Sequence, residues 1–147
     1  MRPILCVVDL TPSSEKVLEI AATVASACRT RLIVLYSYRL VDLGRDANVL
    51  SLKAMMDARA KARFQELGES VLKDKDVVYE FQTEIGFVAD RIRTYVNEKA
   101  AGMVVIGERQ ANDIDEHRAL TVREFIGNMK LPFLIIPEES TVELQRA

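Results

Sequence analysis

Two residues of this sequence stand where a parallel β-sheet protein would be expected to bind a ligand. Asp9 follows the apolar run Ile4–Val8, and Gly107 ends the apolar run that begins at Met103. Continuous apolar runs that stop at a turn residue predict strands buried on both faces of a parallel sheet. In such sheets, ligands bind where the carboxyl ends of the strands open into loops. Asp9 and Gly107 are therefore the first candidates for a binding site.

The segment after Asp9 offers hydroxyl groups at a predicted helix start. Thr11, Ser13 and Ser14 precede an apolar helical pattern. Hydroxyl groups at a helix N-terminus either cap free backbone N–H groups or help to hold an anion. We expect ordinary capping, with Thr11 as the cap and Pro12 in the first helical position. Asp9 has the same two interpretations, as a ligand partner or as a local cap.

The segment after Gly107, residues 108–118, is predicted to be a polar loop. It contains no glycine, so it lacks the residues that let a backbone approach a phosphate closely. Its ionisable residues are Glu108, Arg109, Asp113, Asp115, Glu116, His117 and Arg118. Glu108 and Arg109, together with Arg118, could bind a phosphate from the side, with guanidinium groups in place of backbone amides.

His117 gives the same loop a second possible chemistry. Beside Asp113, Asp115 and Glu116, an imidazole would suit a divalent metal ion or an acid–base pair. The chain has one histidine, and no nucleophile stands in a pattern that would pair with it. We therefore expect a solvated loop, no metal site and no catalytic residues.

Length and composition limit the classes of protein that fit. The chain has 147 residues, of which 49% are hydrophobic and 29% charged, as expected for one globular domain. A formal net charge of −2 gives no reason to expect a nucleic-acid partner. Cys6 and Cys28 form no CxxC pair and are expected to be reduced. No apolar run approaches the ~20 residues of a membrane span, so we expect a cytoplasmic protein with no membrane partner.

Five apolar runs alternate with helical patterns along the chain. The expected strands are residues 4–8, 32–36 (ending near Ser37), 77–84, 103–107 and 133–136, with helices between them. This alternation predicts an α/β protein with a parallel sheet, helices on both faces and right-handed crossovers. We predict a single domain, residues 1–137, and a polar tail, residues 138–147. Gly68 lies inside the second helix, residues 47–73, where a close approach to the sheet would explain it.

Several of these pieces together resemble the universal stress protein family. They are the first strand ending in Val8-Asp9, the Ser-rich helix start, Gly86 before the third helix, the strand ending at Gly107, and the last run, residues 131–137. The resemblance extends from Ile4 to Pro137. It implies an adenine nucleotide alpha hydrolase-like fold with five parallel strands in the order 3-2-1-4-5. In that order Asp9 lies beside Gly107 at the switch point of the sheet.

The resemblance also implies a nucleotide site. In ATP-binding members, the aspartate that closes the first strand and the end of the second strand contact adenine. A G-x-x-G motif, nine further residues and a closing Gly-Ser or Gly-Thr pair then wrap the phosphates. Asp9, Ser37 and Gly107 match the aspartate, the end of the second strand and the first glycine. These three residues are the candidate remnants of an adenine-nucleotide site.

The chain departs from this motif after its first glycine. Gln110 replaces the second glycine, and with a loop one residue shorter the closing pair falls near Ala119-Leu120, without glycine or hydroxyl. We therefore expect no cofactor, and stress-related regulation through a protein partner or a small ligand instead of catalysis. The alternative is a protein that binds ATP or AMP through Asp9 and a rebuilt loop after Gly107, with weak or no ATPase activity.

The two edge strands of the predicted sheet differ in polarity. The third strand carries alternating polar residues at Glu80, Gln82 and Glu84, which discourage pairing with another sheet. The last strand is apolar throughout, and its residues are Phe133, Leu134, Ile135 and Ile136. An undefended edge predicts a pairing partner, and many members of the family pair through this strand. We expect a homodimer with these four residues at its centre.

Overall fold

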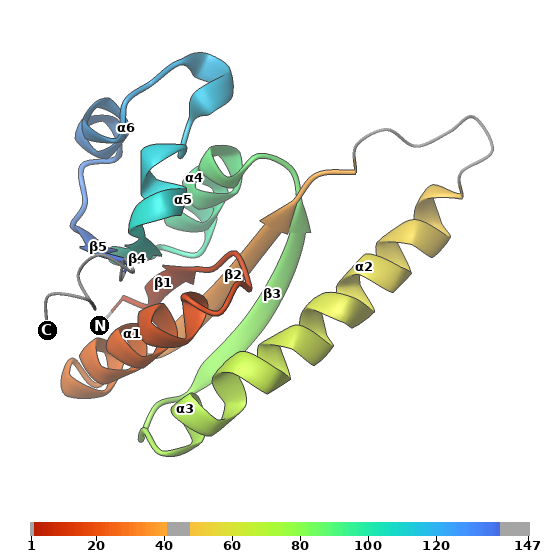
Figure 1. Cartoon of the computed structure of the whole chain (residues 1–147). Coiled ribbons are helices and arrows are strands. Elements are labelled where there is room, and N and C mark those ends of the chain that lie inside the picture. The colour runs from red at the N-terminus through yellow and green to blue at the C-terminus, as the bar shows by residue number, and fades with distance from the viewer. Residues whose placement is uncertain (1, 41–47, 139–147) are drawn as a thin grey trace, which may run out of the picture.

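The computed structural model describes residues 2–40 and 48–138. They form one five-stranded sheet in the order β3-β2-β1-β4-β5, and every neighbouring pair is parallel (Figure 1). The strands are β1 (Ile4–Val7), β2 (Leu32–Tyr38), β3 (Tyr79–Ile85), β4 (Met103–Gly107) and β5 (Phe133–Ile136). The predicted strand order is confirmed. Apart from Glu138, the predicted tail lies outside the described residues.

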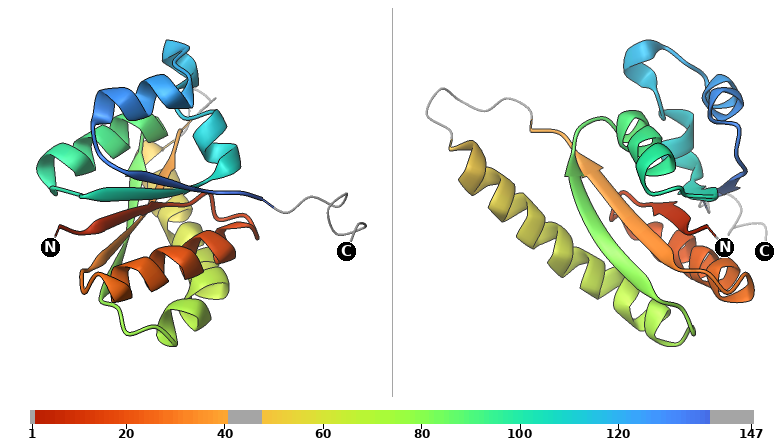
Figure 2. Two further views of the ribbon diagram at one scale, coloured as in Figure 1. Left: turned by 90° about the vertical axis from the view of Figure 1, so that its left-hand side faces the viewer. Right: turned by 180° about the vertical axis from the view of Figure 1, so that it is seen from behind.

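Helices cover both faces of the sheet (Figure 2). One face carries α1 (Ser14–Ala27), α2 (Val49–Phe64), the π-helical turn η1 (Gln65–Glu69) and α3 (Ser70–Lys73). The other face carries α4 (Val88–Glu98), α5 (Glu108–Asn112), the 3₁₀ turn η2 (Glu116–Arg118) and α6 (Val122–Met129). Within the described residues, none of these helices is long and apolar enough to cross a membrane.

The central strand β1 and Val8, the residue after it, supply side chains to both halves of the core. Cys6 and Val8 pack with α1 on one face, while Leu5 and Val7 pack with α4, α5 and α6 on the other. Each of these four residues is at most 1% exposed. This explains why the run is apolar without alternation. Burial raises the pKa of the Cys6 thiol well above its ordinary value.

The long helical segment after β2 contains a tight contact at Gly68. A Cβ atom added to Gly68 would lie 2.8 Å from Leu18 Cδ1 and 3.2 Å from Phe64 Cε1. The close approach predicted at Gly68 is present, but its neighbour is helix α1 and not the sheet. The expected helix start at residue 47 lies outside the described residues; α2 begins at Val49.

Candidate functional site

The carboxyl ends of β1 and β4 are neighbours in the middle of the sheet. Val7 is level with Ile106 in the parallel register, so the chain leaves both strands at the same edge. After β1 it enters α1 on one face, and after β4 it enters α5 on the other. This divergence is a switch point, where open α/β sheets bind their ligands.

Asp9 stabilises the turn between β1 and α1 through hydrogen bonds. Its Oδ1 accepts hydrogen bonds from the Thr11 backbone N–H (3.0 Å), the Thr11 hydroxyl (2.6 Å) and the Ser14 hydroxyl (2.9 Å). Burial raises the pKa of Asp9, but these hydrogen bonds and the charge of Arg109 outweigh burial and hold the pKa below its ordinary value. Asp9 is therefore ionised at neutral pH, and one of its oxygens is engaged inside the turn.

The hydroxyl groups of this turn bond to Asp9 and to each other. Helix α1 begins at Ser14, and Ser13 at its N-cap makes no side-chain capping bond. Thr11 donates to Asp9, and its hydroxyl lies 2.8 Å from that of Ser13. The predicted cap at Thr11 and the predicted helix start at Pro12 were therefore wrong, because Asp9 takes the Thr11 hydroxyl.

A contact from α2 also holds this turn. Arg63 Nε donates to the carbonyl oxygen of Leu10 at 3.1 Å. Leu10 has a φ of 60°, an uncommon conformation for a residue with a side chain. Reasoning from the sequence missed Arg63, because nothing in the chain order links α2 to the β1–α1 turn. The only indication in the sequence was that Arg63 stands next to Phe64, an apolar residue expected to face the core, which would place the start of the Arg63 side chain close to the body of the protein.

Ser37 lies inside β2, which extends to Tyr38, beyond the predicted end of the strand. The Ser37 hydroxyl donates to the carbonyl oxygen of Gly86 at 2.6 Å. Gly86 has a φ of 139°, a conformation that favours glycine. Ser37 therefore holds the connection from β3 to α4, while Asp9 holds the connection from β1 to α1.

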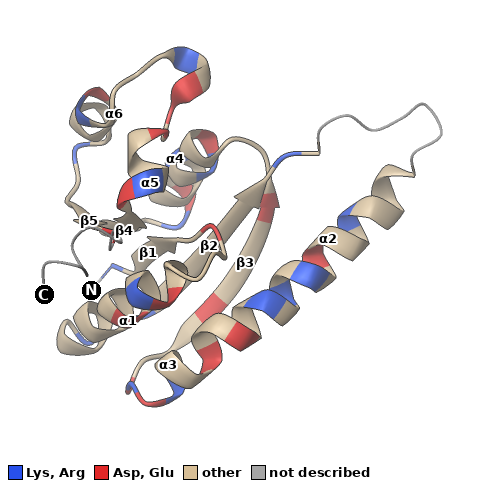
Figure 3. Ribbon diagram, in the orientation of Figure 1, with Lys and Arg blue, Asp and Glu red and all other residues tan. Residues whose placement is uncertain are grey.

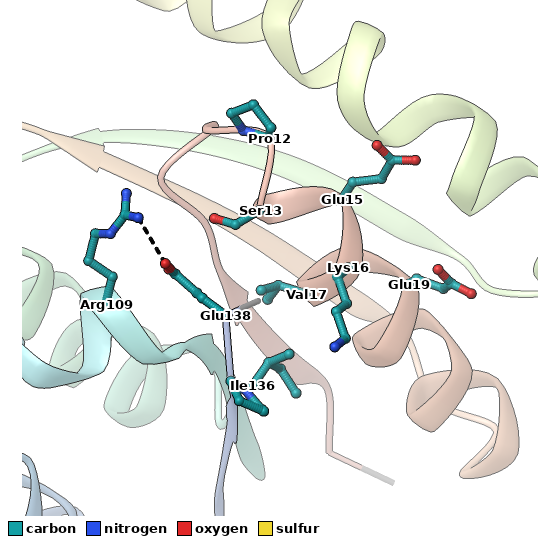
Figure 4. A pocket seen from close by; sticks show the side chains of 10 residues that line it. Pro12, Ser13, Glu15, Lys16, Val17, Glu19, Arg109, Ile136 and Glu138 are labelled. Carbon is teal, nitrogen blue, oxygen red and sulfur yellow. Dashed lines mark ion pairs between the residues drawn. The ribbon is translucent and has the colours of Figure 1, made fainter. Parts of the chain in front are cut away.

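A groove of about 430 Å³ opens beside Gly107, between the first turns of α1 and the segment after β5 (Figure 4). A Cβ atom on Gly107 would lie 3.4 Å from Val17 Cγ2 and 3.8 Å from Glu138 Oε1. Glu138 Oε2 in turn lies 2.9 Å from Arg109 Nη2. The carboxylate of Glu138 therefore lies over Gly107 and is paired with Arg109.

A second cavity, of about 540 Å³, lies at the ends of β2 and β3 and the start of α4. Three side chains stack in its wall. The Arg39 guanidinium lies 4.2 Å from the centre of the Phe87 ring, and the ring centres of Phe87 and His117 are 3.8 Å apart. Asp113 and Glu116 also line the cavity. Arg39 and His117 thus already stack on the Phe87 ring, where a planar ligand would otherwise stack.

The connection between α5 and α6 carries charges of both signs (Figure 3) and is tied to α4. Asp115 is fully buried; its Oδ2 lies 2.6 Å from Arg93 Nη2, and its Oδ1 lies 3.2 Å from His117 Nδ1. Asp90 on α4 accepts hydrogen bonds from Arg118 (2.8 Å) and Arg93 (3.2 Å). Burial alone would raise the pKa of Asp90. The contacts with these cations lower the pKa by more than burial raises it, so the pKa lies below its ordinary value. The prediction that this loop is solvated is therefore wrong at Asp115.

The predicted polar loop after Gly107 is partly helical. Helix α5 begins directly at Glu108, and Ala111 on its inner side is fully buried. Arg109 points to the groove beside Gly107, whereas Arg118 pairs with carboxylates next to α4. The two arginines considered as joint phosphate ligands are therefore separated. Among the described residues, no group of three or more His, Cys, Asp or Glu side chains could hold a metal ion.

The closing pair of the phosphate motif also differs from its predicted position. When nine residues are counted after Gln110, the pair falls on Leu120 and Thr121. The placement near Ala119-Leu120 was wrong by one residue, and the hydroxyl is present. Thr121 is the N-cap of α6; its Oγ1 accepts from the Glu124 N–H at 3.1 Å and donates to the Glu124 carboxylate at 3.0 Å. Gln110 and Leu120 still replace two glycines.

Solved structures of similar fold include three universal stress proteins. One, in complex with cAMP, is 17% identical with a TM-score of 0.68; the match covers 92% of this chain and 96% of that chain. UspA from Lactobacillus plantarum is 16% identical with a TM-score of 0.67, covering 92% and 97%. A protein from Archaeoglobus fulgidus in complex with dAMP is 21% identical with a TM-score of 0.62, covering 92% and 98%.

The sequence comparisons assign the chain to the same group. No curated protein matches this chain in sequence, and at the identities above the structural likeness establishes the fold alone. The sequence model of the universal stress protein family, however, matches residues 1–137. The chain therefore belongs to the universal stress protein family.

Proposed function

We propose that this universal stress protein is a cytoplasmic regulator of the stress response that does not hold ATP through the family's glycine motif. It acts as a homodimer, through a protein partner or a small ligand, and not as a catalyst. The observation that carries this proposal is that polar groups at the switch point are already engaged within the chain. Free thiols at Cys6 and Cys28 fit a reducing compartment.

Three residues that could hold a nucleotide have partners of their own. Asp9 accepts from Thr11 and Ser14 in the β1–α1 turn. Arg109 pairs with Glu138 after β5, and Thr121 exchanges hydrogen bonds with Glu124 in α6. A nucleotide would have to replace these contacts, each hydrogen bond contributing roughly 0.5–1.5 kcal/mol. This competition favours weak binding.

The two lost glycines act in the same direction. A phosphate cradle needs backbone N–H groups that point inward with nothing bulky beside them. Gln110 lies inside helix α5, and Leu120 pairs with Asp115 in an isolated antiparallel bridge. Their side chains stand where the motif has hydrogen atoms, so the backbone cannot approach a triphosphate in the standard way.

Calorimetric titration with Mg-ATP tests the proposal. We expect wild-type protein to bind with a dissociation constant weaker than about 1 mM, which corresponds to about 4 kcal/mol. A constant near 1 μM, or about 8 kcal/mol, would contradict the claim that the motif is disabled. In the double variant Gln110→Gly, Leu120→Gly we expect measurable affinity, which adding Asp9→Asn should abolish. Purified wild-type protein should carry no absorbance from adenine.

Binding of ATP or AMP is the second candidate function. It is favoured by the retention of Asp9, Gly107 and Thr121 at motif positions, and by the cAMP and dAMP present in two solved relatives. In this case Asp9 and a rebuilt loop after Gly107 hold the nucleotide. The same titration with AMP distinguishes the two functions, because the first predicts no affinity for the adenine moiety.

The proposed homodimer is supported by the outer edge of β5. Val104 N–H donates to the carbonyl oxygen of Pro132 at 3.0 Å. Because alternate residues of a strand turn their polar groups to opposite sides, the backbone groups of Phe133 and Ile135 face away from β4. Phe133, Leu134 and Ile135 are each half-buried. An apolar edge with outward N–H and C=O groups suits pairing with a second copy.

A further inference from the structure

The large apolar side chains that remain exposed are gathered at one edge of the molecule. Among the described residues they all belong to α2, to β3 or to the residue just before β3, and they are Val49, Leu50, Met55, Val78, Tyr79 and Ile85. Helix α2 lies along β3 (Figure 2), and the rings of Phe64 and Phe81 stack between them with centres 4.3 Å apart. Apolar side chains gathered in one region of a surface are typical of an interaction site.

Strand β3 turns half of its backbone groups away from the sheet. The Leu32 N–H donates to the carbonyl oxygen of Val78, and the Gly86 N–H donates to that of Tyr38. Because the polar groups of alternate residues point to opposite sides of a strand, those of Phe81 and Thr83 point away from β2. Within the part of the chain that the structure describes, β3 is the last strand on this side of the sheet. An edge of this kind can take up a further strand from another protein.

A groove of about 250 Å³ lies beside this edge on the side of α2. It is lined by Lys61 and Phe64 of α2, Gln65 and Glu69 of η1, and Tyr79 and Phe81 of β3. The Phe64 ring lies edge-on to the Tyr79 ring, with centres 6.1 Å apart. An added strand would turn every second side chain to the α2 side of the sheet. The three rings would offer such a side chain an apolar pocket.

The opposite side of the same edge carries carboxylates. Glu80 lies 3.3 Å from Arg31, and both side chains are nearly half exposed, so this ion pair contributes little and is easily replaced. The Tyr95 hydroxyl donates to the Glu84 carboxylate at 2.9 Å. Burial, this hydrogen bond and the charges of Glu84 and Glu80 raise the pKa of Tyr95 above its ordinary value, although Arg91 opposes them. An added strand would therefore face two carboxylates on this side, where lysine or arginine pairs favourably across strands.

We propose that the outer edge of β3 binds an extended segment of a protein partner in which apolar residues alternate with lysine or arginine. The apolar side chains enter the groove beside α2, the basic side chains face Glu80 and Glu84, and the backbone bonds to Phe81 and Thr83. Two copies of β3 paired antiparallel around Gln82 would instead place Glu80 opposite Glu84, so the edge repels a second copy. The inference deepens the proposed function, on which it rests, by naming the surface that meets the protein partner and the chemistry of that partner.

The test uses the full-length protein and the fluorescently labelled peptide Lys-Val-Lys-Phe-Lys-Val-Lys. Anisotropy measures its affinity, and amide hydrogen exchange locates it. In the complex we expect the N–H groups of Phe81 and Thr83 to exchange at least about tenfold more slowly, and those of β5 to be unchanged. Glu80→Gln should weaken binding by up to about fivefold. The matched control is Glu19→Gln, at an exposed position of α1, which should bind as wild type does.

A peptide of the same residues in block order, Lys-Lys-Lys-Lys-Val-Phe-Val, separates strand addition from general attraction between charges. Equal binding of the two peptides, or equal losses in Glu80→Gln and Glu19→Gln, would overturn the inference, as would no binding of the alternating peptide. Amides of Phe81 and Thr83 that are already protected in the free protein would show that a second copy or another part of the chain covers the edge. Tight binding of Mg-ATP would refute the proposed function separately, because β2 and β1 lie between β3 and β4.

Discussion

The carboxylate of Asp115 lies 2.6 Å from the guanidinium of Arg93, although Asp115 is fully buried and belongs to a loop. The Arg93 guanidinium also lies 4.9 Å from the centre of the Phe125 ring on α6. A buried carboxylate needs such partners, because desolvation of an unpaired charge costs several kcal/mol. Arg93 on α4 therefore fixes both the loop before α6 and α6 itself.

Replacing Asp115 by asparagine should destabilise the fold. Asp115→Asn removes the charge shared by Arg93, His117 and Arg118, and we expect a loss of about 3 kcal/mol in the free energy of unfolding. Urea unfolding followed by circular dichroism measures it. Asp113→Asn, at an exposed position in the same loop, should stay within about 0.5 kcal/mol of wild type. Equal effects of the two changes would show that the buried pair does not fix the loop.

Two glycine-to-alanine changes should have opposite effects. Alanine favours a helix by about 1 kcal/mol over glycine. At Gly127 of α6, apart from the two neighbouring residues and the nearby backbone of the helix itself, no described atom lies within 4 Å of an added Cβ. Gly127→Ala should therefore stabilise the protein by about 0.5–1 kcal/mol. At Gly68 the Cβ would lie 2.8 Å from Leu18, which is fully buried, so Gly68→Ala should destabilise by about 1 kcal/mol. Stabilisation by both changes in urea unfolding would refute the tight contact with α1.

The pKa of Asp9 should depend on the Thr11 hydroxyl. In the folded protein this pKa lies below its ordinary value, which is about 3.9 in an unfolded chain. The ionised form is thus favoured by folding, and its contribution to stability is present above about pH 4 and is lost as the pH falls through the folded pKa. Thr11→Val removes one donor and should raise this pKa in a nuclear magnetic resonance titration of the carboxyl carbon.

Thr23→Val is the control for that titration. The Thr23 hydroxyl donates to the backbone of Glu19 on the exposed side of α1, so its loss should leave the pKa of Asp9 unchanged. A wild-type pKa above 3.9, or no change in Thr11→Val, would mean that the turn does not stabilise the charged carboxylate.

The oligomeric state should depend on the outer edge of β5. Ile135→Pro removes an N–H that faces away from β4, a position where an edge strand tolerates proline. We expect wild type to be a dimer of the 16.5 kDa chain and this variant to be a monomer by light scattering. Thr83→Pro makes the same change at the outer edge of β3 and should remain dimeric. The Leu32 N–H donates to the carbonyl oxygen of Val78, so the alternate residues Tyr79, Phe81 and Thr83 turn their backbone groups away from β2. A dimeric Ile135→Pro variant would place the interface elsewhere.

The order of the strands was predictable because burial on two faces leaves a clear pattern. The residues of β1, Ile4–Val7, are all buried, and such a run has few alternatives to a central parallel strand. Gly107 and Asp9 were identified for the same reason, since each ends a run of this kind. Their positions follow from the sheet, and the family resemblance supplied the order in which its strands pair.

The contacts within the site were not predictable, because their partners are distant in the sequence. Asp115 lies in a polar segment and its spacing indicates a solvated residue, but Arg93, 22 residues earlier, compensates its charge and allows it to be buried. Glu138 follows the last apolar run as the first residue of a polar tail. Its place over Gly107 depends on how the chain leaves β5, which no local pattern encodes.

The π turn at η1 affects how this chain is aligned with its relatives. A π turn contains one more residue than an α turn, so the helix after Glu69 is rotated by about 100° relative to an uninterrupted one. Val71 lies seven residues after Phe64 and four after Leu67, which are both buried, so an uninterrupted α-helix would bury it as well. In the structure Val71 is half-buried, and the next residue, Leu72, is buried at 1% exposure. A relative without the extra residue needs a one-residue gap inside a continuous helix. An alignment that forbids this gap would assign every side chain from Ser70 to Lys73 to the wrong face.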